Sequence, residues 1–447
     1  MSSNHWMMFS TFAEQRHFVY PRKDTYHGII LNANMAAHAP DGIARFILTR
    51  TYQQRYIIDP MTHAFQHDPR HITDSEGKVK RSVMKMAEQY GELIADNVGK
   101  RPLLPSMLQD KDQRKDFVKS CLNFQESHIS QRIETSDDAK YINFDEQPGT
   151  APKPFALLAP YFYMKEATAH LWLDINVKLA ELAVEQKEDI PIFGMLVLSQ
   201  GILLNDTLVN EIVEKFKSIS LNGFLIWIDD LNEGVAEESH LKGLISLGRK
   251  LRAISGPGEV INLHGGYFSI LATSEKLGSP ALSGVCHGPE FGEYRPVIPV
   301  GGGIPIARYY IPLLHERIRY REALAVLKEM GFLRDAASFH AKVCCCTECK
   351  NTIGNNPENF TLFGESNVKL VKRGSGLARM EYPTPRTKLR CLQHYLERKQ
   401  IEYQFASTAS KQQLMEDLNS GHDRFKEIIG LDQVSHLKTW KECFEGE

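Results

Sequence analysis

The middle of the chain alternates between short apolar runs and longer segments in which apolar residues recur at helical spacing. Apolar runs predict buried strands within residues 155–160, 190–198, 223–228, 259–263 and 282–285. Between these runs, apolar side chains recur every three or four positions, which predicts amphipathic helices at about 171–188, 205–216 and 239–254. Strands that alternate with helices predict right-handed βαβ units and therefore a parallel sheet.

Two earlier apolar runs, at residues 28–31 and 55–58, predict further strands of the same sheet. With them the sheet has about seven or eight strands, which suits a (β/α)8 barrel of the TIM type. An open, doubly wound α/β sheet is the competing arrangement. No glycine-rich nucleotide-binding motif follows the first predicted strand, and this favours the barrel.

The chain divides into two parts by composition. We expect residues 1–335 to form the barrel, with a polar insertion or long loop near 98–150. Residues 340–400 form a second irregular region that holds most of the cysteines, and 410–445 is again helical in pattern. We therefore expect residues 336–447 to form a zinc-binding subdomain with C-terminal helices.

Composition indicates an ordinary globular protein, with 42% hydrophobic and 24% charged residues. No apolar run reaches the roughly 18 residues of a membrane span, and the N-terminus lacks a signal-peptide pattern. We therefore expect a cytoplasmic protein without membrane contact. Eight cysteines are too few for a disulfide framework, and four of them lie within 344–349, which indicates metal binding.

Three cysteines, Cys344, Cys346 and Cys349, have the close spacing that wraps a structural zinc ion. The adjacent Cys345 could replace one of them. A tetrahedral site needs a fourth ligand, and the candidates are Cys391 and His394 on a predicted helix, and His340 upstream. A redox-active or merely buried cysteine cluster is the alternative interpretation.

Basic residues concentrate directly after the cysteine cluster. Residues 366–399 hold nine Lys or Arg against two acids, Glu381 and Glu397, which gives this stretch a net charge of +7. A segment of this kind can neutralise several phosphates and supply affinity for nucleic acid that does not depend on base sequence. The alternative is a solvated basic face with no partner.

Polar side chains follow four of the predicted strands, where a barrel carries its chemistry. The candidates are Asp59, Gln200, Gly201, Asp229, Asp230, His264 and Gly265. Carboxylates at two strand ends suit acid–base or nucleophilic chemistry, and the others are candidate substrate contacts. Structural alternatives exist for each kind: Asp59 precedes a proline and can begin a turn, and Gln200 can bond loop backbone.

The order of these motifs resembles that of the tRNA-guanine transglycosylases, zinc-containing barrels that exchange guanine in nucleic acid for a 7-deazaguanine. Residues 59–66 are similar to the family's Asp-Ser-Gly-Gly-Phe-Gln motif but are two residues longer, and 193–201 resembles its base-reading segment. Residues 223–231 fall at the family's next strand, and 344–351 matches its zinc motif closely. The chain resembles a distant member, with the DNA-modifying branch included.

The resemblance implies a mechanism and a set of partners. Asp230 or Asp229 would attack C1′ of a flipped nucleotide, Asp59 would transfer protons, and Gln200 would read the base edge. It implies zinc as the cofactor, tRNA or DNA and a purine-like base as partners, and assembly as a dimer or as a complex with other subunits. Two features depart from the family: residues 282–286 lack its nucleophilic aspartate, and 406–410 lacks its zinc histidine.

These departures leave two other classes of function open. One is a zinc-containing subunit that binds nucleic acid without catalysis. The other is an unrelated barrel enzyme, such as a hydrolase that uses His264 or His287.

Overall fold

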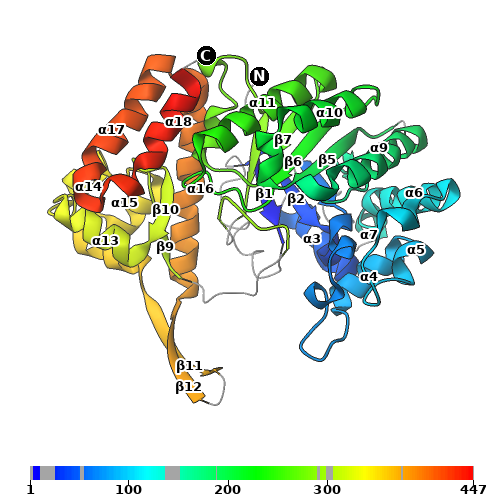
Figure 1. The fold of residues 1–447 in the computed structure, drawn as a ribbon. Helices are drawn as coiled ribbons and strands as arrows, with labels where there is room; N and C mark the ends of the chain where they lie inside the picture. The colour runs from blue at the N-terminus through cyan, green and yellow to red at the C-terminus, as the bar shows by residue number, and fades with distance from the viewer. Residues whose placement is uncertain are drawn as a thin grey trace.

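Eight parallel strands form one nearly closed barrel (Figure 1) in the order β3-β2-β1-β8-β7-β6-β5-β4. The computed structural model describes residues 4–10, 26–50, 55–135, 152–187, 189–288, 292–298, 306–373 and 376–445. The strands are β1 (Asn4–Phe9), β2 (Gly28–Asn32), β3 (Arg55–Asp59), β4 (Leu157–Leu158), β5 (Ile192–Leu198), β6 (Gly223–Ile228), β7 (Glu259–Asn262) and β8 (Gly284–His287). At the seam, Phe155 N–H donates to Tyr56 O at 2.8 Å beside β3 and β4.

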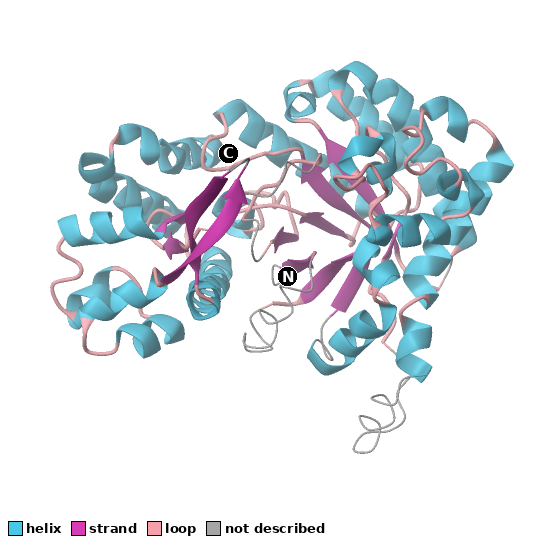
Figure 2. Ribbon diagram, turned by 90° about the horizontal axis from the view of Figure 1, so that it is seen from below, coloured by secondary structure: helices cyan, strands magenta, loops and turns pink. Residues whose placement is uncertain are grey.

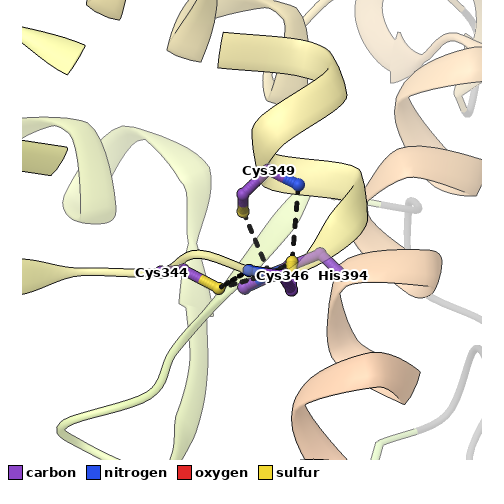
Figure 3. Close-up of side chains that lie close together, drawn as sticks. All are labelled: Cys344, Cys346, Cys349 and His394. Carbon is purple, nitrogen blue, oxygen red and sulfur yellow. Dashed lines mark hydrogen bonds between the residues drawn. The ribbon is translucent and has the colours of Figure 1, made fainter. Parts of the chain in front are cut away.

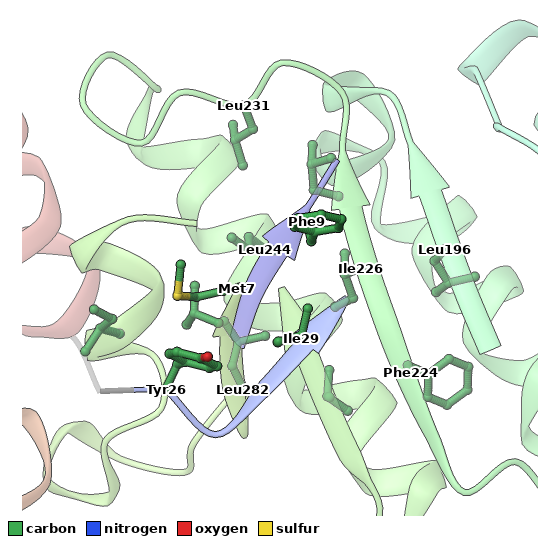
Figure 4. Packing of buried hydrophobic residues seen from close by; sticks show 14 of the residues in the cluster. Met7, Phe9, Tyr26, Ile29, Leu196, Phe224, Ile226, Leu231, Leu244 and Leu282 are labelled. Carbon is green, nitrogen blue, oxygen red and sulfur yellow. The ribbon is translucent and has the colours of Figure 1, made fainter. Parts of the chain in front are cut away.

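Both faces of each strand are buried, because alternate side chains fill the barrel and pack against the outer helices. In β1, Trp6 and Met8 point into the barrel, whereas Met7 and Phe9 join the core under the helices (Figure 4). Gly28 of β2 makes room for this packing, since a Cβ there would lie 2.2 Å from the Trp6 ring. This two-sided burial explains the continuous apolar runs in the sequence.

Helices surround the barrel on the outside (Figure 2). They are α2 (Ala33–His38), α3 (Pro40–Arg50), α4 (Arg81–Gln89), α5 (Glu92–Ala95), α6 (Lys111–Ser127), α7 (Ser130–Thr135), α9 (Ala169–Gln186), α10 (Asp206–Lys217), α11 (Glu238–Ser255) and α12 (Tyr267–Leu271). The described helices include none that is long and apolar enough to cross a membrane. The strands and helices predicted from apolar periodicity are confirmed in type and place.

The polar stretch near 98–150 differs from the expected insertion or loop. Residues Lys111–Ser127 form helix α6, whose buried residues include Phe117 and Leu122, and this helix contacts β4 and α9. The segment is polar because the exposed positions of α6 are mostly charged and its buried positions include Arg114 and Gln125, so its weak apolar signal concealed a regular helix of the barrel's outer layer. Residues 136–150 lie outside the described part of the chain.

The remaining elements form a C-terminal unit beside the barrel (Figure 1). Its elements are β9 (Arg308–Ile311), β10 (Glu316–Arg319), α13 (Tyr320–Glu329), α14 (Ala336–Lys342), α15 (Thr347–Ile353), β11 (Ser366–Arg373), β12 (Gly376–Pro383), α16 (Pro385–Thr408), α17 (Lys411–Ile429) and α18 (Ser435–Glu445). Because β9 and α13 contact α16 and α17, this unit begins before the expected boundary at residue 336.

A buried ionic network joins the barrel to the C-terminal unit. The Lys399 ammonium of α16 has no exposed side-chain surface and lies 2.7 Å from Glu293 Oε1, on the loop after β8. It also contacts Glu402 Oε2 at 3.1 Å, while the other oxygen of Glu402 lies 2.9 Å from His315 Nδ1. The His315 ring stacks on Tyr267 of α12 with 3.6 Å between ring centroids. These contacts fix α16 against the barrel.

Candidate functional site

Four side chains of the C-terminal unit form a buried metal-type cluster (Figure 3). Cys344 follows α14, Cys346 caps the N-terminus of α15, Cys349 lies in that helix, and His394 comes from α16. Their ligand atoms all lie within 4.8 Å of one another. Three sulfurs and one imidazole nitrogen at this separation can enclose one metal ion with four ligands.

The surroundings of the cluster orient its ligands. The His394 Nε2–H donates to the Tyr310 carbonyl at 2.7 Å, which leaves Nδ1 free to face the sulfurs at 3.3–3.6 Å. The Tyr309 ring stacks on the imidazole with 4.3 Å between centroids. Hydrogen bonds from Cys346 and Cys349 hold the pKa of the Cys344 thiol well below its usual range, and such an anionic sulfur is the form that binds a metal. The contact of His394 with the Tyr310 carbonyl is of the kind that fixes the tautomer of metal-binding histidines.

The structure selects among the predicted ligands. Cys344, Cys346, Cys349 and His394 belong to the cluster. The expectation of Cys391 as a ligand is wrong, because its Sγ contacts the Phe363 carbonyl at 3.4 Å, where α16 packs on residues 357–363. The other two alternatives also fall outside it: Cys345 is exposed, and His340 contacts the carbonyls of Cys344 and Gly354.

A second cluster lies at the carboxyl end of the barrel strands. Asp59, the last residue of β3, is 2% exposed and accepts hydrogen bonds from Tyr161 OH at 2.5 Å and Met61 N–H at 2.9 Å. Burial raises the pKa of Asp59 although these hydrogen bonds and Arg295 oppose the shift. Met61 adopts a left-handed backbone with φ of 51°. Asp59 therefore begins a tight turn and also presents a carboxyl group whose pKa is raised by burial.

Asp229 and Asp230, which follow β6, have different surroundings. The Asp229 carboxylate accepts from Tyr163 OH at 2.5 Å and from Val297 N–H at 2.7 Å. Asp230 is exposed, has a left-handed backbone with φ of 52°, and donates its N–H to Arg295 O. Asp229 is therefore the residue of this pair whose carboxylate belongs to the hydrogen-bond network of the barrel mouth.

Aromatic rings pack between the two carboxylates. His63 stacks on Tyr161 with centroids 5.4 Å apart, and Trp227 lies edge-on to both His63 and His264 at 5.3 and 5.0 Å. Burial, reinforced by neighbouring positive charge, lowers the pKa of both histidines to about 3, so both rings are neutral. Among the described residues, His264 Nε2 is buried and has no hydrogen-bond partner. The mouth thus contains an aromatic cluster with one unused polar atom.

The other predicted contacts have structural roles in this arrangement. Gln200 Nε2 donates to the carbonyls of Asp229 and Asp230 at 3.0 and 3.1 Å, so its amide holds the turn after β6. At Gly201 and Gly265 a side chain would displace its neighbours, since a Cβ would approach Glu166 Oε1 to 1.6 Å and Ser269 Oγ to 2.7 Å. These residues lie around the mouth and position its groups.

Sequence reasoning did not identify the residues that connect the two carboxylates. Tyr161 and Tyr163 alternate directly after the apolar run of β4, which was the available signal. Glu233 was also missed as an individual residue. It is 5% exposed and accepts from Gly266 N–H at 2.9 Å at the start of α12. Burial, with a smaller contribution from Glu293, raises the pKa of Glu233 to about 7.

No protein-family model and no curated protein matches the chain. A barrel alone does not identify a function, because this fold carries many unrelated reactions. The metal-type cluster and the carboxylates of the mouth are therefore the features from which a function can be inferred.

Proposed function

We propose that the chain is a zinc-containing enzyme that exchanges a purine base in nucleic acid, as its resemblance to the tRNA-guanine transglycosylases implies. The observation that supports this most is the pair of tyrosine-bound carboxylates, Asp59 with Tyr161 and Asp229 with Tyr163. The two tyrosines are two residues apart in an extended segment, which puts their Cα atoms about 7 Å apart on one side of the chain. Two carboxyl groups from different strands, each held by a tyrosine of one segment, suit a double displacement at an anomeric carbon.

The two carboxyl groups have complementary roles in this reaction. The Asp229 carboxylate attacks C1′ of a flipped nucleotide and forms an ester bond while the C1′–N9 bond breaks. The departing base keeps the electron pair of that bond and takes a proton from Asp59, whose pKa is raised by burial in the direction that a general acid needs. The incoming base then returns a proton from N9 to Asp59 as N9 bonds to C1′ and displaces the Asp229 carboxylate.

The aromatic cluster provides the environment for a planar base. Trp227 and His63 offer apolar ring surfaces, and the unpaired His264 Nε2 offers a hydrogen bond to a polar edge. Gln200, which the family resemblance made a base reader, instead positions the turn that carries Asp229. The Arg295 carbonyl accepts from Trp227 Nε1–H, and Val297 N–H donates to Asp229 Oδ1, so residues 295–297 lie against the aromatic cluster and the Asp229 carboxylate.

We infer that the metal is zinc and that its role is structural. Three thiolates and one histidine are a typical zinc ligand set, and four protein ligands leave no open position for a substrate. The ion would link α15 to α16 and so stabilise the C-terminal unit. The free thiols also suit a reducing compartment such as the cytoplasm.

Base exchange can be tested with labelled guanine and either tRNA or duplex DNA. Asp59→Asn and Asp229→Asn should each lower the exchange rate by about 10²–10⁴-fold, the range for loss of an acid–base or nucleophilic group. Asp230→Asn is the matched comparison because it removes an adjacent but exposed carboxylate. Exchange that survives both of the first two substitutions would overturn the proposal.

The same assay separates catalysis from binding alone. Nucleic acid that binds in a salt-dependent way, with no exchange in the wild type and no effect of Asp59→Asn on affinity, would identify a non-catalytic subunit. Absence of both binding and exchange would leave the unrelated barrel enzyme.

A further inference from the structure

A two-stranded β-hairpin projects from the C-terminal unit (Figure 1). Strands β11 and β12 pair over eight residues each, from Ser366 with Pro383 to Arg373 with Gly376. Among the described strands, neither pairs with any other. Three large apolar side chains on the hairpin, Val368, Leu370 and Leu377, are 51%, 65% and 70% exposed. An exposed ribbon with apolar side chains of this size indicates a surface that contacts a partner.

The charge of the hairpin indicates an anionic partner. Residues 366–383 carry four basic residues, Lys369, Lys372, Arg373 and Arg379, against a single acid, Glu381. Glu381 is neutralised by an ion pair with Arg321 at 2.8 Å. Within the described part of the chain neither Lys369 nor Arg379 forms an ion pair, so both charges are available to a ligand, although Lys369 also lies 5.6 Å from the centroid of the Tyr382 ring.

The strand register distributes this charge over both faces of the ribbon. Lys369 pairs with Met380, and the next pair is Leu370 with Arg379. Because successive pairs point to opposite faces of a ribbon, Lys369 and Arg379 lie on opposite faces. A ribbon with basic side chains on both faces fits between two walls of phosphates better than it fits a single flat surface.

We propose that this hairpin is an arm that enters the major groove of double-stranded DNA. The major groove of B-form DNA is about 12 Å wide and admits a two-stranded ribbon, whereas the major groove of A-form RNA is too narrow and deep. Eight residues of strand reach about 27 Å. In the groove, Lys369 contacts the phosphates of one wall and Arg379 those of the other, and Leu370 and Leu377 lie on the same face as Arg379.

The base of the hairpin connects it firmly to the rest of the chain. Thr384 N–H donates to Glu365 O at 3.0 Å, directly beyond the last strand pair. Thr384 also caps α16 by accepting from Thr387 N–H at 3.0 Å. The partly buried Arg390 of α16 donates to Glu365 Oε2 at 3.2 Å. The arm is thus fixed to the helix that carries His394, so DNA held by the arm has a defined position relative to the C-terminal unit.

The proposal names duplex DNA as the substrate class, and only its link to base exchange rests on the proposed function. Binding is measured by fluorescence anisotropy with a 20-base-pair DNA duplex over a series of salt concentrations. In one variant, Asn-Gly replaces residues 366–383. A two-residue turn fits here because the flanking residues are already hydrogen-bonded to each other. In a second variant, K369A with R379A, the backbone of the hairpin remains intact.

We expect the double variant to lower DNA affinity on the order of 50-fold at 0.1 M salt, because two lost phosphate contacts reduce the salt slope by about 1.8. The hairpin replacement should lower it at least as much. The control K111A with K119A removes two exposed lysines of α6, on the outside of the barrel, and should leave affinity unchanged.

Three results would overturn the proposal. The first is DNA affinity that is unchanged in both hairpin variants, and the second is equal affinity for a 20-base-pair RNA duplex. The third is a hairpin replacement that converts a dimer to a monomer without weakening DNA binding, which would identify a self-association arm. Failure of the proposed function is distinguishable, because a wild-type protein that shows no exchange but binds DNA through the hairpin refutes only the catalytic assignment.

Discussion

Replacement of Glu233 by glutamine should change the stability of the protein in a pH-dependent way. The difference in stability between variant and wild type should favour the variant more at alkaline pH than at acidic pH. Glu233 is buried at the start of α12, and burial raises its pKa from 4.5 to about 7. An acid whose pKa is raised by folding prefers the folded state when protonated. Its contribution is therefore fully present below pH 4.5 and is lost as the pH rises towards 7. Glutamine carries no charge at any of these pH values and removes this dependence.

The size of the effect follows from the shift. A change of about 2.5 pKa units corresponds to ~3 kcal/mol of unfolding free energy between pH 4.5 and pH 8. For a chain of 447 residues, the entropy of unfolding at the midpoint is about 0.9 kcal/mol/K. The difference in Tm between variant and wild type should therefore change by about 3 °C across this pH range.

Thermal unfolding followed by circular dichroism at pH 4.5, 6 and 8 measures this difference. The change of ΔTm with pH is the informative quantity, because glutamine also alters the hydrogen bond to Ser269 equally at every pH. Glu329→Gln, at an exposed position of α13, is the control and should show no pH dependence of ΔTm. A constant ΔTm for Glu233→Gln would refute the assignment of a raised pKa to this buried carboxyl group.

Four further substitutions test the packing and the metal centre. Cys349→Ser should lose the stoichiometric zinc, whereas Cys391→Ser should retain it, as measured by mass spectrometry of the purified proteins. Equal zinc content in the two variants would refute the ligand set. Lys399→Met leaves the buried Glu402 carboxylate and the partly buried Glu293 carboxylate without their cation and should cost about 3–5 kcal/mol in chemical unfolding. A loss below 1 kcal/mol would contradict the buried network. Gly223→Ala puts a Cβ 2.5 Å from Glu259 O and should lower the free energy of unfolding by about 1–3 kcal/mol. An unchanged free energy of unfolding would show that β6 and β7 separate easily at this position.

The barrel could be predicted largely from sequence because each strand is buried on both faces and therefore reads as a continuous apolar run. Strand β1 was not predicted. Its first residues, Asn4 and His5, are polar, and their place in the sheet depends on partners far along the chain. Asn4 bonds Glu259 and the His5 ring contacts His287, contacts that no local pattern contains.

The spacing of residues in the sequence does not decide which side chain is the fourth metal ligand. Cys391 and His394 lie three residues apart on one helix, so both are near the cluster. The rotation of α16 decides between them, and this rotation depends on its packing against residues 357–363 and on the Tyr310 carbonyl. Sequence therefore predicted the three cysteines and narrowed the fourth ligand to a few candidates.

The sequence also does not decide which of two adjacent aspartates belongs to the site. Asp229 and Asp230 are equivalent by composition and by position after β6. The backbone becomes left-handed at Asp230, which leaves this residue exposed, while Asp229 bonds Tyr163 and Val297. Turn geometry of this kind depends on the loop after β8, which is distant in sequence.

Helix α16 fixes the distance between the hairpin and the barrel. It begins at Pro385, at the foot of the hairpin, and its Tyr403 donates to Val285 O of β8 at 3.1 Å. Eighteen residues of helix separate these points, a span of about 27 Å. Since a helix hardly stretches, insertion of one helical turn would move the arm by about 5 Å and rotate it little. The length of α16 therefore sets how far from the barrel a partner held by the arm is presented.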